Sequence, residues 1–577
     1  MAPLIIGLSM LAIICGCIRP WPASTSQPVI LTAVPTSTLQ PHNTSTPLPL
    51  APSATPTLQP EPTQTAPPQL KVWVDPDLAK NFSAEWNLAP EEMAESETPA
   101  NLRFEIGGSG TPIGTWVYAL AAPFPTLVDE VKLSDVKSTW QGSPGGVMRD
   151  IRLMVDESTR LVLERVWGAP SSDVMVVDSA DQVDTAWRER TCWAILPFEK
   201  LVPRWKVIRI DGRSPYDRNL DASAYGLAFP VTMEGDAWAG NRFTERFGPV
   251  DGTLMTNRDP EKLTVLVMTG VSALVRGTAW FMQQKGLLYP GRDIRDWLLA
   301  ADLTHVSNEV SFDPQCPTPD PNDPTLSFCS NPQNIQLLED VGVDIIEMTG
   351  NHLNDFGWEW VNYTIEMYKA RGWLYFGAGP DQEQARKPLL VTDHGNRLAF
   401  IGCNIAGPPA DWATVSTAGT TNCGYPDLDA VETEIRGLVS EGYLVIFTVQ
   451  YYESYDPTPL PIHYTDFRRL SDAGAVIVSG SQAHLPQAME LRGGGFIHYG
   501  LGNLFFDQMD TPWPDTRNEF IDHHVFYDGR YLGVDLLTAT LEDYVKPRPM
   551  TAQEREAELT KIFEVSGWPQ SDAKEWR

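Results

Sequence analysis

The sequence predicts an α/β protein with two folded parts in series. Its 577 residues suffice for two or three domains of the usual size. From Leu70 onward, short apolar runs alternate with amphipathic segments of helical period, which is the order of an α/β fold. Several runs are hydrophobic at almost every position, as expected of strands covered on both faces. We therefore expect sheets flanked by helices.

The first part is expected over residues 70–259. Its strands are predicted at Lys71–Val74, Leu102–Ile106, Val174–Val177 and Trp205–Ile210, and its helices at Asp156–Trp167 and Asp181–Arg190. The segments WVYALAAPFPT and WAILPFEKLVPRWKVIRIDG resemble, loosely, the two-lobed solute-binding proteins of bacterial envelopes. That resemblance implies a solute-binding role for this part; the alternative is a spacer.

The second part is expected over residues 260–577. Its strands are predicted at Thr264–Thr269, Asp344–Thr349, Leu398–Cys403, Leu444–Val449, Val476–Ser479 and Phe496–Tyr499. Its helices are predicted at Asn334–Val341, Trp358–Arg371, Leu428–Glu441 and Thr465–Ala473. Each strand ends in a polar or glycine-rich turn. Since ligands of such sheets bind beyond the carboxyl ends of the strands, functional residues are expected in these turns.

The N-terminus carries the features of an exported lipoprotein. The apolar run Leu4–Ile14 is too short for a membrane-spanning helix of about 20 residues but suits a signal sequence. The following Cys15-Gly16-Cys17 resembles a bacterial lipobox, although the first three residues lack the usual Lys or Arg. We predict a signal peptide over residues 1–17, with lipidation at Cys17 and an outward-facing, membrane-anchored protein.

Residues 18–69 are predicted to form a disordered tether. Between Pro20 and Gln69 there are 13 Pro, 10 Thr and 5 Ser and a single acid, Glu61, a composition that cannot bury a core. Extended Pro-rich chain rises about 3.1 Å per residue, so the tether could reach up to ~150 Å from the membrane.

Charge and cysteine content limit the partners and the compartment. With 43 Lys and Arg against 74 Asp and Glu, the net charge is −31, which repels phosphate backbones and excludes nucleic acid as a partner. In an exported chain, Cys316 with Cys329 and Cys403 with Cys423 are expected to form local disulfides that each close one loop. Cys192 is left as a buried free thiol. Metal ligation is the alternative for the pairs, but no CxxC or Cys/His spacing supports it.

The turn after Asp344–Thr349 holds the strongest candidate site. It reads Gly350-Asn351-His352-Leu-Asn-Asp355, in which an amide oxygen could bind a divalent ion and a histidine could act as a general acid. The alternative is a helix cap in which Asn351 or Asp355 accepts hydrogen bonds from the helix that follows.

Three further segments contain residues that could bind a metal or a substrate but could instead have a purely structural role. His484 in GSQAH is a metal-ligand candidate or a histidine under a turn. Asp302 and Glu309 flank a strand end and could be ligands or solvated charges. Asn503 lies in YGLGN, a glycine-broken strand that is more typical of structure than of catalysis.

In this order and spacing, the turns resemble the CapA family, named for poly-γ-glutamate capsule biosynthesis and built on the calcineurin-like metallophosphoesterase fold. The motifs GNHLNDFG and YGLGNLFFD and the stretches FGAGPDQEQARKP and LSDAGAVIVSG carry the resemblance, over about Leu263 to Tyr544. It implies a β-sandwich flanked by helices for the second part. It also implies His352 and Asp355 as catalytic residues, Glu309, Asn351 and His484 as metal ligands, and Gln450, Glu453, Gln482 and Asn503 as substrate-binding residues.

The sequence departs from the family where the metal ligands belong. Val271 stands in place of an Asp, Ser307 in place of an Asn, and Val449 and Gln482 in place of His. A two-cation centre needs enough carboxylates and imidazoles to hold cations roughly 3.5 to 4 Å apart. The sequence therefore predicts a degenerate site, with one divalent ion (Mn, Zn or Fe) or none; Gln450 or Asp302 could supply a replacement ligand.

Two hypotheses of function follow. In the first, an exported CapA-like protein acts in the synthesis or processing of a cell-surface polymer, poly-γ-glutamate or polysaccharide, as a metal-dependent hydrolase or as part of the synthesis machinery. In the second, it is a non-catalytic envelope protein that binds a solute or polymer, which the lost ligands favour.

Overall fold

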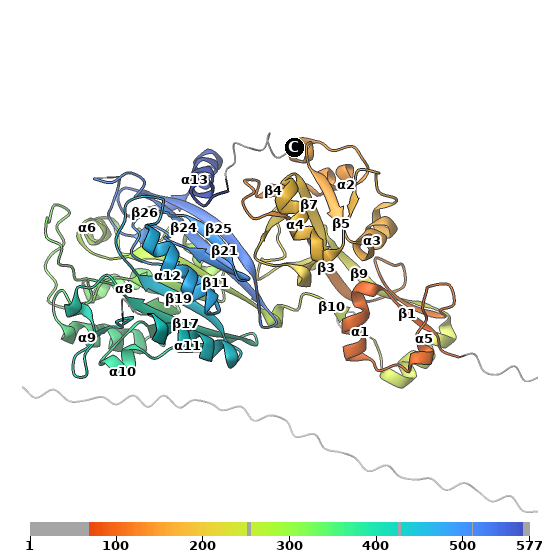
Figure 1. Ribbon diagram of the computed structural model, residues 1–577, viewed down its shortest axis with the longest axis horizontal. Helices are drawn as coiled ribbons and strands as arrows, with labels where there is room; N and C mark the ends of the chain where they lie inside the picture. Colours follow the sequence, from red (N-terminus) through yellow and green to blue (C-terminus); the bar gives the residue numbers. More distant parts are fainter. Residues whose placement is uncertain (1–68, 251–254, 425–427, 511, 569–577) are drawn as a thin grey trace, which may run out of the picture. The chain divides into compact units, whose positions relative to one another are not determined.

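The computed structural model describes residues 69–250, 255–424, 428–510 and 512–568. All of them belong to one compact unit, Pro68–Arg577 (Figure 1). The predicted signal peptide, Cys17 and the tether up to residue 68 lie outside the described residues. Within the described part, no helix has the length and apolarity needed to cross a membrane.

Residues 72–256 build a ten-stranded sheet with helices beside it. The order along its main path is β1-β2-β9-β3-β7-β5-β6, while β10 and β8 pair with β3, and β4 with β8. The strands are β1 (Val72–Val74), β2 (Leu102–Ile106), β3 (Thr111–Pro123), β4 (Glu130–Val131), β5 (Arg152–Val155), β6 (Met175–Val176), β7 (Cys192–Pro197), β8 (Trp205–Ile210), β9 (Ala228–Gly235) and β10 (Met255–Thr256). The helices are α1 (Ala79–Glu85), α2 (Leu133–Trp140), α3 (Glu157–Trp167), α4 (Ser179–Glu189) and α5 (Ala237–Phe247).

Local sequence explains most of these elements. The helix predicted from Asp156 begins there because the Asp156 carboxylate accepts a hydrogen bond from the Thr159 amide (2.9 Å). It ends at Gly168, whose φ of 84° few other residues adopt. The sequence analysis did not assign β3, the longest strand of this sheet; its run WVYALAAP is apolar throughout and has no period that distinguishes strand from helix.

The second half contains an eight-stranded sheet of order β14-β13-β12-β11-β24-β25-β26, with β23 paired to β11. Its strands are β11 (Leu263–Ser272), β12 (Leu303–Asn308), β13 (Ile345–Glu347), β14 (Leu374–Phe376), β23 (Asn503–Phe505), β24 (Asn518–Tyr527), β25 (Arg530–Glu542) and β26 (Lys546–Pro549). The helices that accompany it are α6 (Arg276–Lys285), α7 (Arg295–Leu299), α8 (Ile335–Asp340), α9 (Trp358–Lys369) and α13 (Ala552–Val565).

A six-stranded sheet of order β16-β17-β19-β20-β22-β21 forms the other layer. Its strands are β16 (Leu389–Asp393), β17 (Asn396–Asn404), β19 (Leu444–Gln450), β20 (Ala475–Gly480), β21 (Met489–Arg492) and β22 (Gly495–His498). The pair β15 (Ala378–Gly379) and β18 (Gly419–Thr420) stands apart, and the helices are α10 (Gln382–Ala385), α11 (Asp429–Ser440) and α12 (Pro461–Asp472).

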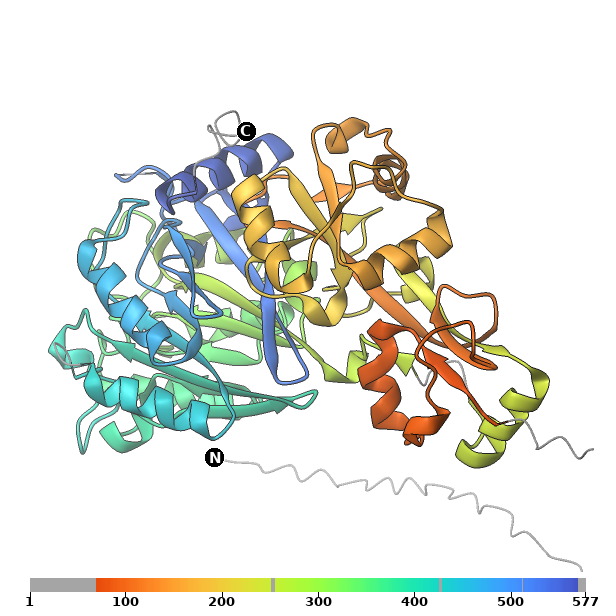
Figure 2. The same ribbon diagram turned by 45° about the vertical axis from the view of Figure 1, so that its right-hand side comes forward.

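The two sheets pack face to face, which confirms the predicted sandwich flanked by helices. Met268 of β11 belongs to the same buried cluster as Phe400 of β17 and Ile446 of β19. On the outer faces, α8 and α9 pack on the eight-stranded sheet and α11 and α12 on the six-stranded one, each in its own apolar cluster. Figure 2 shows these layers from a second direction.

Parallel pairing brings the functional turns to one edge of each sheet. β11, β12, β13 and β14 run parallel in one sheet, as do β17, β19, β20 and β22 in the other. Their carboxyl ends therefore share an edge, and the turns that follow them meet there.

Both predicted disulfides are present. Cys316 is bonded to Cys329, and Cys403 to Cys423. Cys192 is a buried free thiol, as predicted.

Candidate functional site

Four turns bring the predicted residues together beyond the strand ends. Glu309 follows β12, and Asn351 and His352 follow β13, while the other sheet contributes the last residue of β19 and the turn after β20. The contributions of the second sheet are Gln450, Gln482 and His484. Glu309, Gln450, Gln482 and His484 are each at most 5 % exposed.

The side-chain amide of Gln450 lies at the centre of this group. Its Nε2 donates to Glu309 Oε1 (2.9 Å) and to Asn351 Oδ1 (2.8 Å), and it also contacts Gln482 Oε1. Three oxygens from three different turns thus converge on one amide nitrogen. The arrangement joins the two sheets at the site.

The orientation of that amide follows from its neighbours. The Glu309 carboxylate cannot donate a hydrogen bond, so the amide must turn its NH₂ toward it. On the other side, the Ser481 hydroxyl donates to Gln450 Oε1 (2.8 Å). Glu309 Oε2 is buried without a hydrogen-bond partner among the described residues.

His352 and Asp355 form a hydrogen-bonded pair beside this group. His352 Nδ1 donates to Asp355 Oδ2 (2.8 Å), which also accepts a hydrogen bond from the Phe328 amide (2.7 Å). The Phe328 ring lies 4.5 Å from the His352 ring. Burial opposes protonation of His352, but the hydrogen bond to Asp355 and the charge of Glu309 outweigh it, so the pKa of His352 is raised.

Asp411 belongs to the same cluster and was missed by the sequence analysis. It lies in the loop after β17, where the Asn354 amide donates to Asp411 Oδ1 (3.3 Å) and Oδ2 is buried without a partner among the described residues. Burial and the negative charge of Asp355 raise the pKa of Asp411 to about 7. The loop sequence GPPADW, which contains Asp411, carries no catalytic motif. The only sequence signal for Asp411 was that its loop follows a strand of the six-stranded sheet.

His484 is held from behind by Asn503. His484 Nδ1 donates to Asn503 Oδ1 (2.8 Å), and Asn503 Nδ2 donates back to the His484 carbonyl (3.0 Å). The other ring nitrogen of His484, Nε2, lies 3.8 Å from Glu453 Oε1. Asn503 is fully buried, whereas Glu453 is exposed.

The residues present do not fit the two-cation centre that the resemblance implies. Val271 is buried where β11 pairs with β23, and its side chain offers no donor atom to a cation. Val449, aligned with a family histidine, packs in the apolar cluster under α11 and α12, so Gln450 faces the site instead. The Glu309 carboxylate and the amides of Asn351 and Gln482 surround the position where a cation would lie. The Gln450 amide already donates hydrogen bonds to their oxygens there.

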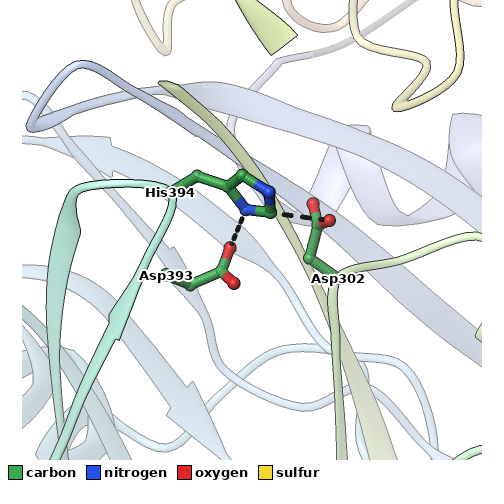
Figure 3. Close-up of side chains that lie close together, drawn as sticks. All are labelled: Asp302, Asp393 and His394. Carbon is green, nitrogen blue, oxygen red and sulfur yellow. Dashed lines mark hydrogen bonds and ion pairs between the residues drawn. The ribbon is translucent and has the colours of Figure 1, made fainter. Parts of the chain in front are cut away.

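The fold brings three side chains that could bind a metal together elsewhere: Asp302, Asp393 and His394 (Figure 3). Asp302 precedes β12, and His394 precedes β17, so this cluster lies at the opposite strand ends from Glu309. The Arg218 guanidinium donates to Asp302 (2.6 Å) and contacts His394 Nε2 (2.7 Å), which places a cation in the cluster already. Asp302 therefore does not complete the site at Glu309.

Sequence comparisons find bacterial capsule synthesis proteins among the relatives of this chain. A family model described as "Bacterial capsule synthesis protein PGA_cap" matches residues 265–508. "Capsule biosynthesis protein CapA" of Bacillus anthracis is 24% identical over 315 residues, 54% of this chain and 73% of that protein. "PGA biosynthesis protein CapA" of Bacillus subtilis (strain 168) is 24% identical over 209 residues, 36% of this chain and 53% of that protein.

The solved structures that resemble this chain do so only with low TM-scores. Haemophilus influenzae NAD nucleotidase gives a TM-score of 0.28 at 9% identity, covering 54% of this chain and 61% of that chain. An ABC-type phosphate transport receptor from Vibrio cholerae gives 0.27 at 9% identity, covering 31% of this chain and 93% of that chain. The motifs, the sandwich and the family-model match together show that residues 265–508 of this chain are similar to the bacterial capsule synthesis proteins of the CapA family.

Proposed function

We propose that the chain acts in the synthesis of a bacterial cell-surface polymer, poly-γ-glutamate or a polysaccharide, and that its CapA-like part holds the polymer rather than hydrolysing it. The family supports the biological role. The observation that carries the binding role is the Gln450 amide, whose Nε2 donates to Glu309 and Asn351 where a cation would be expected. Amides and carboxylates suit hydroxyl or amide groups of a polymer better than they suit a tightly bound metal.

Metal content tests the binding role directly. We expect the full-length protein, incubated with Mn²⁺, Zn²⁺ and Fe²⁺ and then dialysed, to retain substoichiometric metal by elemental analysis. We also expect its affinity for labelled poly-γ-glutamate or capsular polysaccharide to be unchanged in EDTA. A full equivalent of metal that disappears in His484→Ala, or a loss of polymer affinity in EDTA, would contradict the proposal.

The second candidate function is hydrolysis, which the His352–Asp355 pair favours. A histidine whose pKa is raised by a carboxylate partner keeps its proton to higher pH than a free histidine and can donate it to a leaving group. The mark of this function is polymer cleavage that an added divalent ion supports and that His352→Ala abolishes. Cleavage that persists in His352→Ala would remove the assigned role.

We further propose export and lipid anchoring through Cys17. The expected result is incorporation of labelled fatty acid into the wild-type chain and none into Cys17→Ser. Cys15→Ser is the matched control, since it changes a neighbouring cysteine and should remain labelled. Label retained in Cys17→Ser would place the anchor elsewhere.

A further inference from the structure

Exposed aromatic side chains gather at the edge where the candidate site lies. The exposed aromatics among the described residues are Trp238, Phe356, Trp358, Tyr363, Tyr452, Trp513 and Tyr544. Four of the seven lie in the segments that follow β13, β19 and β23, namely Phe356, Trp358, Tyr452 and Trp513. β23 pairs parallel with β11, so its carboxyl end lies at the same edge of the sheet as those of β12 and β13. Clustered exposed apolar side chains mark interaction sites, whereas single ones need no explanation.

Trp513 is the outermost member of a stack of four rings. The Phe506 ring lies 5.1 Å from the His484 ring, and the His484 ring lies 6.0 Å from that of Tyr455. The Tyr455 ring in turn lies 4.9 Å from that of Trp513, and neighbouring ring planes differ by at most 20°. Exposure rises along the stack from 3 % at Phe506 and 5 % at His484 to 47 % at Trp513. This ring stack therefore leads from the candidate site to solvent.

The outer half of the ring stack is restrained in position. The Tyr455 hydroxyl donates to Glu453 Oε1 and accepts a hydrogen bond from Gln508 Nε2 (3.0 Å). A proline precedes Trp513 and another follows it. Because proline fixes its own φ and restricts the residue before it, this segment has few conformations to lose. A ligand that stacks on Trp513 therefore pays little entropy for ordering the protein.

The hydrogen-bonding groups beside the ring stack and at the candidate site include several side-chain amides. Gln508 contacts Tyr455, and Gln450 and Asn351 lie at the candidate site. A side-chain amide both donates and accepts, so it can pair with the N–H and the C=O of another amide. The face of an aromatic ring carries partial negative charge, which attracts the positive N–H edge of an amide. A chain of amide groups therefore matches both the rings and the polar groups beside them.

The arginines near the ring stack are already engaged by acids. Arg276, which lies over the ring at the buried end of the stack, is ion-paired with Asp507 (2.7 Å). Arg517 is ion-paired with Asp510. Glu453, which accepts the hydrogen bond from the tyrosine of the stack, is itself an exposed acid. The carboxylates of a polymer gain no free cation from these residues, so they are expected to remain in solvent.

We propose that the ring stack is a platform that holds a polyamide, with the flat amide groups of poly-γ-glutamate stacked on Trp513 and the carboxylates of the polymer left in solvent. The inference rests on the proposed polymer-holding function. It deepens that function by naming the recognised part of the polymer, the amide backbone, and the residue that contacts it, Trp513. Tyr455 packs against the Trp513 ring and positions it.

Binding of labelled poly-γ-glutamate to the full-length protein, measured by fluorescence anisotropy, tests the platform. We expect Trp513→Ala to weaken binding about tenfold through loss of stacking, and Trp513→Phe, which keeps a ring, to weaken it about threefold or less. Trp238→Ala is the matched control and should bind as the wild type does, because Trp238 is a similarly exposed aromatic (38 %) on α5, outside the ring stack. An unchanged melting midpoint in Trp513→Ala, followed by circular dichroism, assigns the loss to binding.

Competition with the wild-type chain identifies the recognised group without any variant. Polyacrylate has the carboxylates but no amides, and dextran has neither, so neither of them should displace the label. Raising NaCl from about 0.05 to 0.5 M should not weaken binding, because salt screens the repulsion between a chain of net charge −31 and a polyanion. Recognition of carboxylates by cations would be weakened by the same change.

Equal binding by Trp513→Ala and the wild type would show that the platform is wrong. Displacement by polyacrylate, or binding that falls as salt rises, would show recognition of carboxylates instead. Displacement by dextran, or binding of labelled dextran alone, would show a polysaccharide site. In each of these cases the wild type still binds a polymer, so only the platform is overturned. Failure of the wild type to bind either polymer would overturn the proposed function itself.

Discussion

Replacing Gln450 with leucine is expected to lower the free energy of unfolding by about 3 kcal/mol, because several buried polar groups lose their partner at once. Leucine has a similar size, so the change removes hydrogen bonds with little change in volume. It leaves the Glu309 carboxylate and the Asn351 carbonyl without the amide donor that they share, and Ser481 without its acceptor. Urea denaturation of the variant beside the wild type measures the difference.

The same variant should lose affinity for the polymer, since the amide organises the turns on both sheets. Gln333→Leu is the matched control: Gln333 is exposed, and its change should stay within about 0.5 kcal/mol. Wild-type stability in Gln450→Leu would show that the amide is not the centre of the hydrogen-bonded group, and the argument against a metal would weaken with it.

Replacing Asp411 with asparagine is expected to stabilise the protein at pH 8 by roughly 2 to 4 kcal/mol and to change little at pH 4. Burial and the charge of Asp355 raise the pKa of Asp411 from 3.8 to about 7 in the folded protein. The folded state therefore binds the Asp411 proton more tightly than the unfolded chain does. Wild-type stability should fall as the pH rises from about 4 to about 7, and asparagine, which does not ionise, avoids this loss.

Unfolding curves of Asp411→Asn and the wild type between pH 4 and pH 8.5 test both the sign and the size of the stability difference. The advantage of asparagine should grow through that window and level off above pH 7. Asp296→Asn, an exposed change on α7, is the control and should run parallel to the wild type. An advantage that is largest at pH 4, or absent throughout, would mean that Asp411 is ionised and partnered in the folded protein.

Most of the C-terminal sandwich could be predicted from local pattern. The apolar runs predicted six of its strands and the amphipathic periods four of its helices, close to their observed bounds. The pair β24 and β25 was missed, as was β3 in the first half. Alternation is weak in these long strands because both of their faces are largely buried, and their pairing partners are what define them.

By itself, the sequence determined the resemblance to the CapA family and the turns that carry Glu309, Asn351 and His484, because strand ends and motif order are local properties. Only the tertiary structure decided that the Gln450 amide lies between Glu309 and Asn351 while Val449 packs in the core, since successive strand residues point to opposite faces. The tertiary structure likewise added Asp411 to the candidate site and removed Asp302 from it. Asp411 lies in a loop of the other sheet, and Asp302 lies at the opposite end of β12 from Glu309. Neither position could be predicted, because sequence spacing does not encode distances between separate strands.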